Sequence, residues 1–365
     1  KRAYCLKTQP ATGETYPKSD LFNKAGAIML NFKSVKSGLF LVAFITPQVL
    51  FAQNIALGVN SHIINQNIDQ TKKSIILTKD LKMQYIRMDL PWRLIESTKG
   101  NYQIPKDVDA KINLLLRSNI QPIIILDYGN KYYNNGDKPI TDESIDAFVK
   151  YATYVVNYYK NRIFYYQIWN EWDSNLGNTK PGKVDDYKKL VKETYTAIKK
   201  ESPEIKVITS SFSAAAFNKT LGIDSRNFIN TYLTDDMSHF TDIIAIHPYT
   251  AYRKGYFSNY QIYKKQIQYT MNFIRKGSFK DKPVFITEIG WSTSNSPQGI
   301  SEKTQKQFIN NAICDAKKAG ISAIIIYELN DASSNIYDTE SGFGLVKYNG
   351  LKKPAYVGIK SNNCL

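Results

Sequence analysis

The stretch FYYQIWNEWD, residues 164–173, decides how the rest of the chain is interpreted. Its first half is dominated by apolar and aromatic residues, as expected of a short strand that is buried in a sheet. The run then ends abruptly in Asn170 and Glu171. A later stretch, PVFITEIGW at 283–291, ends in the same way and carries Glu288 near its tip. Two apolar strands that each end in a glutamate indicate that the strand ends serve chemistry as well as stability.

Short apolar runs recur along the chain and define its architecture. They begin near residues 55, 85, 121, 164, 206, 242, 283 and 322. Segments of helical period lie between them, with Thr141 and Ser301 as expected N-caps. Runs such as Ile123–Leu126 are continuously apolar, which is typical of a parallel sheet covered on both faces. Eight such units predict a closed (β/α)₈ barrel over residues 53–365. The alternative is an open doubly wound sheet, but the first strand is followed by Gly58–His62, which is not a Gly-rich phosphate turn.

The first 52 residues differ from the rest of the chain. Lys33 and Lys36 precede an apolar run at 38–52, and Met29 stands before both. This order predicts a signal peptide at 29–52, cleaved after Ala52, with residues 1–28 as an upstream extension of the reading frame. The run is too short to span a bilayer comfortably, so no lasting membrane anchor is expected. We therefore expect an exported protein, either periplasmic or secreted.

The charge distribution, the histidines and the cysteines limit the partners, metals and cross-links that we expect. The net charge is +16, but seven of the 48 basic residues lie in the first 52 residues and the others are scattered. No basic stripe or nucleic-acid motif is present, so nucleic acid is not an expected partner. Three histidines without zinc spacing, and no acidic calcium loop, lead us to expect no metal and no cofactor. Export leaves Cys314 and Cys364, which could be a disulfide or two free thiols.

In a (β/α)₈ barrel the active site lies where the strands end, so the strand ends are searched for reactive side chains. They carry Asn60, His62, Arg87, Asp89, Asp127, Tyr128, Asn170, Glu171, His247, Tyr249, Glu288, Trp291, Tyr327, Glu328 and Asp331. No Ser or Cys stands next to a base as a nucleophile. The ends of strands four and seven face each other across the mouth of a barrel. Glycosidic bond cleavage needs two carboxyl groups, and a separation of about 5–5.5 Å would give retention of configuration.

The neighbours of the two glutamates suggest their roles. Arg87 could hold Glu288 ionised as the nucleophile, and Tyr249 could donate a hydrogen bond to the same carboxylate. Glu171 stands between two tryptophans, whose apolar rings would raise the pKa of a general acid. Asn170 could bind a sugar 2-hydroxyl. Glu328 and Asp331 are rival carboxylates, for which structural pairing or contact with the substrate is expected. The other expected substrate contacts are His247, Trp291, Tyr327, Trp172 and Tyr128.

Three motifs resemble the signatures of clan A glycoside hydrolases: Ile168–Trp172, His247–Tyr249 and Ile286–Ser292. Within that clan the chain is most similar to family 39 and its bacterial exopolysaccharide-processing relatives. The resemblance implies a retaining (β/α)₈ enzyme with Glu171 as acid/base and Glu288 as nucleophile. One departure concerns strand eight, which often ends in a Trp in this clan and here ends in Tyr327.

These observations predict an exported retaining glycoside hydrolase that cleaves β-glycosidic bonds of a polysaccharide. Endo action is favoured, and an exopolysaccharide would suit the resemblance. One alternative is an exo-acting glycosidase similar to a β-xylosidase. Another is a catalytically idle barrel that binds polysaccharide, although the presence of both Glu171 and Glu288 argues against it.

Overall fold

The computed structural model describes residues 54–365. The predicted signal peptide at 29–52 and the upstream extension at 1–28 lie outside the described residues, and so does the expected first residue of the mature chain, Gln53.

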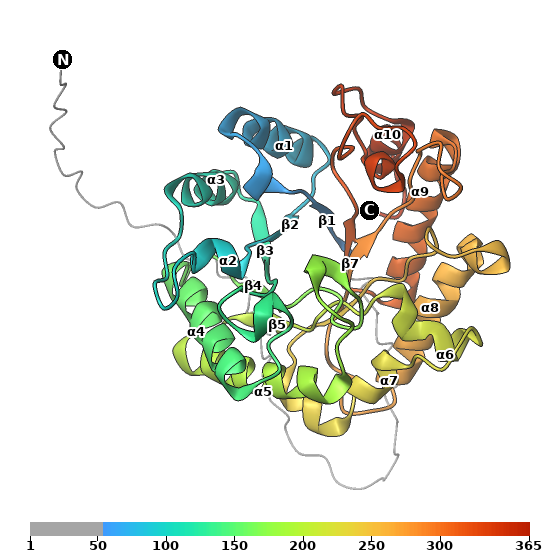
Figure 1. The fold of residues 1–365 in the computed structure, drawn as a ribbon. Coiled ribbons are helices and arrows are strands. Elements are labelled where there is room, and N and C mark those ends of the chain that lie inside the picture. Colours follow the sequence, from blue (N-terminus) through green and yellow to red (C-terminus); the bar gives the residue numbers. More distant parts are fainter. Residues whose placement is uncertain (1–53) are drawn as a thin grey trace, which may run out of the picture. The chain divides into compact units, whose positions relative to one another are not determined.

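Eight strands form one parallel sheet at the centre of the described chain (Figure 1). They are β1 Ala56–Asn60, β2 Tyr85–Asp89, β3 Gln121–Leu126, β4 Tyr165–Ile168, β5 Lys206–Ile208, β6 Ile244–Ile246, β7 Val284–Ile289 and β8 Ala323–Ile326. Their order is β5-β4-β3-β2-β1-β8-β7-β6, and isolated parallel bridges from Ile208 to Ile243 and from Phe212 to Ile246 link the two ends of the sheet. The predicted (β/α)₈ barrel is confirmed, and each strand begins within two residues of its predicted start.

Helices surround the sheet. They are α1 Ile68–Asp80, α2 Trp92–Ile95, α3 Lys106–Arg117, α4 Asp142–Tyr158, α5 Val184–Glu201, α6 Asn218–Leu221, α7 Phe228–Tyr232, α8 Tyr260–Ile274, α9 Glu302–Ala319 and α10 Pro354–Lys360. Thr141 caps α4 in a reciprocal capping box with Ser144, and Ser301 caps α9 through the backbone of Thr304, as the sequence predicts. No helix within residues 54–365 is long and apolar enough to cross a membrane.

The barrel interior changes from apolar to polar along the strands. At the N-terminal end of the strands Tyr85 and Tyr165 pack with Phe285. Because side chains two residues apart share a face of a strand, the next interior layer holds Arg87, Gln167 and Thr287. All three of these polar side chains are buried. The apolar layer closes one end of the barrel, and the polar layer supports the other end, where the site lies.

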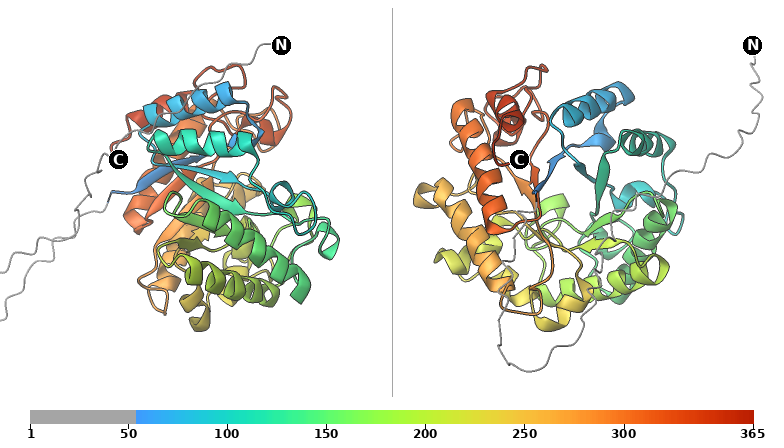
Figure 2. Two further views of the ribbon diagram at one scale, coloured as in Figure 1. Left: turned by 90° about the vertical axis from the view of Figure 1, so that its left-hand side faces the viewer. Right: turned by 180° about the vertical axis from the view of Figure 1, so that it is seen from behind.

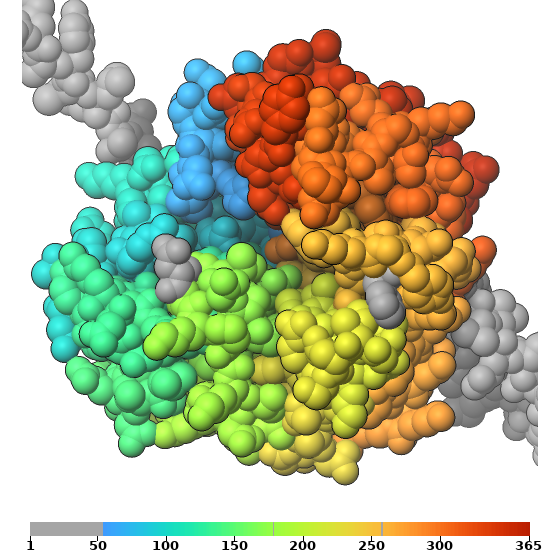
Figure 3. Space-filling view, turned by 45° about the vertical axis from the view of Figure 1, so that its right-hand side comes forward, coloured from blue at the N-terminus to red at the C-terminus, as the bar shows by residue number. Residues whose placement is uncertain are grey.

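The first and last parts of the described chain pack together. Helix α10 packs on α9, and Tyr356 donates a hydrogen bond to Asp80 at the end of α1 over 2.7 Å. These segments lie side by side in two views (Figures 2 and 3). A disulfide joins Cys314 on α9 to Cys364 near the C-terminus, which settles the question that the sequence left open.

Candidate active site

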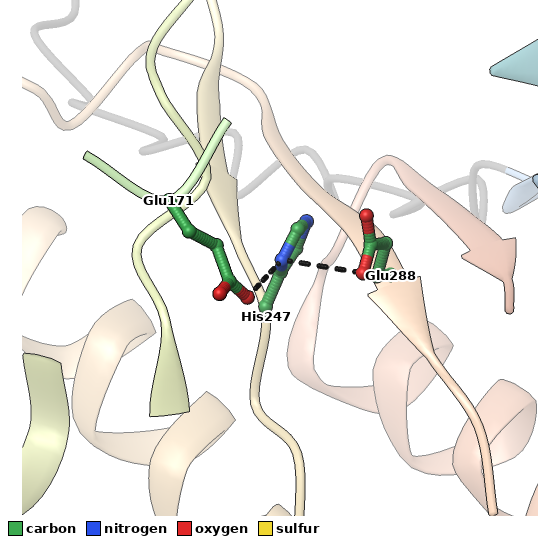
Figure 4. Close-up of side chains that lie close together, drawn as sticks. All are labelled: Glu171, His247 and Glu288. Carbon is green, nitrogen blue, oxygen red and sulfur yellow. Dashed lines mark hydrogen bonds and ion pairs between the residues drawn. The ribbon is translucent and has the colours of Figure 1, made fainter. Parts of the chain in front are cut away.

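Two glutamates meet at the carboxyl ends of the strands (Figure 4). Glu171 lies three residues beyond the end of β4, and Glu288 is the second-to-last residue of β7. His247, the first residue after β6, stands between them. One carboxylate oxygen of each glutamate and one ring nitrogen of His247 lie within 4.8 Å of one another. We predicted from the sequence that the two carboxyl groups face each other, and that prediction is confirmed.

The backbone on either side of Asn170 is strained. Trp169 has φ 66° and Glu171 has φ 43°, which is left-handed backbone that side-chain-bearing residues adopt at a cost of roughly 1–3 kcal/mol each. Neighbouring strands hold this conformation in place. The amide of Trp169 donates to the carbonyl of Leu126 over 3.0 Å, and the amide of Trp172 donates to the hydroxyl of Ser210 over 2.9 Å. The surrounding barrel therefore fixes the direction in which Glu171 points.

Glu288 is held by a cation and a phenol. Arg87 donates to its Oε1 over 2.5 Å, and Tyr249 donates to its Oε2 over 3.1 Å. Both contacts were predicted from the sequence. Burial raises the pKa of Glu288, whereas Arg87 and Tyr249 act in the opposite direction because they stabilise the carboxylate.

Arg87 is itself fixed in one orientation. Its guanidinium is buried, and each of its five N–H donors is directed at an acceptor. Besides Glu288, the acceptors are Asn60, Gln167, Asn170 and Ser211, at 2.8–3.4 Å. Arg87 therefore presents its positive charge to Glu288 from a rigid frame.

The environment of Glu171 favours its protonated form. Burial raises the pKa of Glu171 well above its usual range, and the negative charge of Glu288 raises it further. His247 contacts the Oε1 of Glu171 through Nδ1 at 2.7 Å and the hydroxyl of Thr287 through Nε2 at 3.0 Å. Because burial lowers the pKa of His247, the imidazole is neutral and adds no positive charge beside Glu171. From the sequence we attributed the raised pKa to the apolar surroundings of Glu171, and burial is its largest cause; the charge of the second glutamate is an additional cause.

A cavity of about 320 Å³ opens above the two glutamates. Five of the predicted substrate contacts line it together with Glu171 and Glu288: Arg87, Tyr128, Asn170, Tyr249 and Tyr327. Asn170 donates to the hydroxyl of Tyr128 over 2.9 Å, which ties the walls from β3 and β4 together. Tyr327 stands at the end of strand eight, where clan A members often have a tryptophan, and its ring also lies on the cavity wall.

Three predicted contacts lie elsewhere. His247 is buried between the glutamates and does not line the cavity. Trp172 and Trp291 are packed inside the protein, where their indole N–H groups donate to the carbonyl of Lys183 and the hydroxyl of Thr250. Their predicted place on the sugar-facing wall is wrong, because each indole fills space between the barrel and its helices. They support the site from behind.

Several cavity residues were not assigned a role from the sequence. Asn60, His62 and Asp89 stood among the strand ends without one, and Ser61, Met88, Ile125, Leu176 and Glu340 were not predicted. Tyr252 also lines the cavity. His62 lies 3.7 Å from Asp89 and 3.4 Å from Glu328, and their negative charges raise the pKa of His62 to about 10. The two rival carboxylates, Glu328 and Asp331, have different surroundings. Glu328 is buried beside His62, and Asp331 forms an ion pair with Lys353 at 2.7 Å.

Glu171, His247 and Glu288 are also, within residues 54–365, the one group spaced to hold a metal ion. All three of these residues are already engaged, since Arg87 bonds to Glu288 and His247 bonds to Glu171. The positive charge of Arg87 beside Glu288 opposes a further cation at this point. That the protein binds no metal therefore remains a prediction from the sequence.

Comparison with known proteins gives one family match and many similar folds. Residues 52–333 match the family described as cellulase (glycosyl hydrolase family 5). A search of curated proteins finds no match. A family 39 glycoside hydrolase from the gut symbiont Bacteroides cellulosilyticus superposes with a TM-score of 0.71 at 23% identity, over 86% of this chain and 64% of that one. The chain thus spans less than two thirds of that protein.

Two further solved structures have the same fold at lower identity. A monomeric β-xylosidase from Caulobacter crescentus gives a TM-score of 0.63 at 17% identity, over 84% of this chain and 67% of that one. A family 5, subfamily 18 protein from Bifidobacterium longum subsp. infantis gives 0.64 at 12% identity, over 84% and 78%. At these identities the likeness is one of fold.

Proposed function

Because the chain belongs to the cellulase family, glycosyl hydrolase family 5, we propose that it hydrolyses β-glycosidic bonds within a polysaccharide with retention of configuration. The chain is a clan A glycoside hydrolase whose fold is similar to that of family 39 members, and its substrate is a carbohydrate. The proposal concerns the stereochemistry, the two residues that carry it and the position of the cleaved bond.

The distance between the two carboxyl groups carries the mechanism. An oxygen of Glu171 lies within 4.8 Å of an oxygen of Glu288. Retaining glycosidases place their carboxyl groups about 5–5.5 Å apart, whereas inverting enzymes need about 6.5–9.5 Å to admit a water molecule. Glu288 attacks the anomeric carbon while Glu171 donates its proton to the leaving oxygen. Water then hydrolyses the glycosyl ester at Glu288, with Glu171 accepting the proton.

The electrostatics of the pair support this cycle. Arg87 and Tyr249 stabilise the carboxylate of Glu288, so Glu288 is the member of the pair that ionises first. Its charge keeps the pKa of Glu171 high and the proton in place. When Glu288 becomes an ester its charge disappears, and the pKa of Glu171 falls. Glu171 thereby changes from acid to base without any movement.

A second cavity supports endo action. It has a volume of about 550 Å³ and shares Ser61 and His62 with the catalytic cavity. The loops after β1 and β8 form it, and β8 lies directly across the barrel from β4, which precedes the proton donor. It therefore extends the site on the side away from the leaving group.

The charges around the catalytic cavity favour a neutral sugar or an amino sugar over a uronate. Asp89 and Glu340 line this cavity in addition to the two catalytic candidates. The cations that line it are already engaged, Arg87 by Glu288 and His62 by Asp89 and Glu328. A substrate carboxylate would therefore meet uncompensated negative charge.

The alternative is exo action of the β-xylosidase kind, for which the fold likeness to the Caulobacter β-xylosidase is the support. Reduced oligosaccharides of increasing length separate the two. An endo enzyme releases internal fragments and gains kcat/KM as the chain grows on the non-reducing side, whereas an exo enzyme releases one sugar at a time.

Removing each carboxyl group tests the roles. We expect Glu288→Ala to lose activity by at least about 10⁴-fold and Glu171→Gln by about 10²–10⁴-fold on substrates with poor leaving groups. Azide should restore turnover of Glu288→Ala and give a glycosyl azide of inverted configuration. An idle polysaccharide-binding barrel would have no activity to lose, and a wild-type product of inverted anomeric configuration would refute retention.

Export to the periplasm or beyond is also part of the proposal, and it rests on the sequence of residues 29–52. N-terminal sequencing of the protein from the extracytoplasmic fraction should give Gln53 as the first residue. Recovery of the uncleaved chain in the cytoplasm would count against it.

A further inference from the structure

Lys138 is buried, and all three N–H donors of its amine form hydrogen bonds with one loop. It lies in the segment between β3 and α4, and its residue is 3% exposed. Its Nζ donates to the carbonyl of Ser174 over 2.9 Å, to the hydroxyl of Thr179 over 2.6 Å and to the carbonyl of Lys180 over 2.6 Å. An ammonium group has three N–H donors, so none is left for solvent. All three acceptors belong to residues 172–183, which we name the β4 loop because it follows that strand.

The ammonium group also rests on the tryptophan pair behind the site. Its Nζ lies 5.7 Å from the ring centre of Trp169 and 5.6 Å from that of Trp172, within the range of a cation–π contact. These two residues flank Asn170 and Glu171 in the sequence. Lys138 therefore contacts both the strained segment that carries Glu171 and the loop that leaves it.

No carboxylate neutralises this amine directly. Within residues 54–365, Lys138 forms no ion pair, and Asp137 and Asp173 are the acidic groups whose charges reach it. Asp137 instead accepts the backbone amide of Lys180 over 3.0 Å, which adds a second link to the same loop. Burial lowers the pKa of Lys138 to about 8, so the amine is mostly charged at neutral pH.

The β4 loop forms a wall of the catalytic cavity. Leu176 lines the cavity, and Gly177 packs so closely on the ring of Tyr128 that a Cβ there would lie 2.3 Å from the ring. Tyr128 in turn accepts a hydrogen bond from Asn170. At the far end of the loop, Gly182 packs on the indole of Trp172 with similar closeness. The loop therefore packs against Trp172 near its far end and against Tyr128 in its middle.

We propose that Lys138 is a positioning residue that fixes the β4 loop as the binding wall for the sugar on the leaving-group side. This proposal rests on the proposed function, because it takes Glu171 as the proton donor to the leaving oxygen. The loop begins immediately after Glu171, so its cavity-lining residue Leu176 faces the part of the substrate that departs. Lys138 touches no substrate and acts through the loop.

A comparison of two leaving groups tests the proposal. The substrates share one glycone, and one carries a sugar as the leaving group while the other carries a small activated phenol. We expect Lys138→Met to raise KM for the sugar-leaving substrate by about tenfold while kcat/KM for the aryl glycoside changes by less than about twofold. Lys138→Arg, which keeps the charge, should restore part of the difference. Lys131→Met is the matched control, since Lys131 lies in the same segment with its amine over the ring of Tyr132 but is exposed.

Equal effects on both substrates, or no effect on either, would overturn the proposal. If Lys138→Met does not fold, Thr179→Val removes one acceptor only and should produce a smaller effect of the same kind. Tryptophan fluorescence gives a readout that does not depend on activity. Emission of the wild type should titrate near pH 8 as the amine over the indoles loses its proton, and Lys138→Met should not show this transition. A wild type without the transition would contradict the placement of the amine.

The two proposals can fail separately. If Glu171→Gln keeps full activity, the proposed function fails, whereas the fluorescence titration still reports whether Lys138 lies on the tryptophan pair. If Glu171→Gln behaves as expected and the two leaving groups respond alike to Lys138→Met, the function stands and the positioning role is excluded.

Discussion

Two chemically identical side chains differ here because of what surrounds them. Arg87 and Tyr249 bond to Glu288, whereas the neighbours of Glu171 are a neutral imidazole and the charge of Glu288. The first environment favours a carboxylate, and the second favours a carboxylic acid. The difference between the two glutamates is therefore a property of the buried network, and small changes to that network should be visible in the pH profile.

Tyr249→Phe removes the hydrogen bond to Glu288 and keeps the ring. Because that bond stabilises the carboxylate, its loss raises the pKa of Glu288. Activity requires Glu288 to be ionised, so the acid limb of kcat/KM should move to higher pH. The plateau should fall by about tenfold, as expected for one hydrogen bond to a charged group. The measurement is kcat/KM across the pH range at constant ionic strength.

Tyr252→Phe is the control for this experiment. Tyr252 also lines the cavity, but its hydroxyl donates to Glu340 over 2.6 Å and does not bond to Glu288. Its removal should leave the acid limb where it is. An acid limb that moves to lower pH in Tyr249→Phe would mean that the phenol does not stabilise the carboxylate.

At the scale of elements, the strands were predictable and the loops were not. The eight apolar runs and the caps at Thr141 and Ser301 are local signals, and each gave the element that the sequence indicated. Strand ends also revealed Arg87, Glu171, Tyr249 and Glu288, because a barrel brings successive strand ends to one mouth. Leu176 and Glu340 reach the cavity from loops whose path depends on tertiary packing, and no local pattern marks them.

The β4 loop gives a prediction at this scale, with two glycines as a matched pair. Gly177 has φ +69° and Gly222 has φ +70°, so alanine carries a similar backbone cost of about 1 kcal/mol at either position. A Cβ at Gly222 meets nothing within 4 Å, whereas one at Gly177 would lie 2.3 Å from the ring of Tyr128. Gly177→Ala should therefore lower the free energy of unfolding by roughly 1–3 kcal/mol more than Gly222→Ala does.

Gly177→Ala should also reduce kcat/KM, because Tyr128 and Asn170 lie between the loop and the glutamates, while Gly222→Ala should leave kcat/KM unchanged. Denaturant unfolding and steady-state kinetics on the two variants check both statements. Equal losses of stability in the two variants would show that the loop can move away from Tyr128 at little cost.

At the scale of the whole molecule, repeated features could be predicted from the sequence, whereas contacts between residues far apart in the sequence could not. A barrel was expected from the repetition of one unit, and repetition is visible in a single sequence. The pairing of Cys314 with Cys364 was left open, because two cysteines do not say whether their backbones approach each other. The two indoles at 172 and 291 were misplaced for a related reason: an aromatic residue beside a strand end can face the ligand or the helices, and packing around the barrel decides between them.

The disulfide gives the prediction that belongs to the whole chain. It ties α9 to the C-terminal segment across 50 residues of sequence, and α10, which lies within that interval, contacts α1 through Asp80. Because the cross-link restricts the unfolded chain, replacing both cysteines with serine should lower the free energy of unfolding by about 2–4 kcal/mol. Neither cysteine lines a cavity on the catalytic face, so kcat/KM at low temperature should stay within about twofold of the wild type.

Denaturant unfolding with and without a reductant measures the stability, and the double variant provides the control because reductant should not affect it. A wild type whose unfolding is unchanged by reductant would mean that the two thiols are free in solution. A stabilising disulfide would in addition suit an oxidising compartment outside the cytoplasm, as the sequence of residues 29–52 predicts. Stability in reductant and the N-terminal residue of the recovered protein are independent measurements, so agreement between them would support export more strongly than either alone.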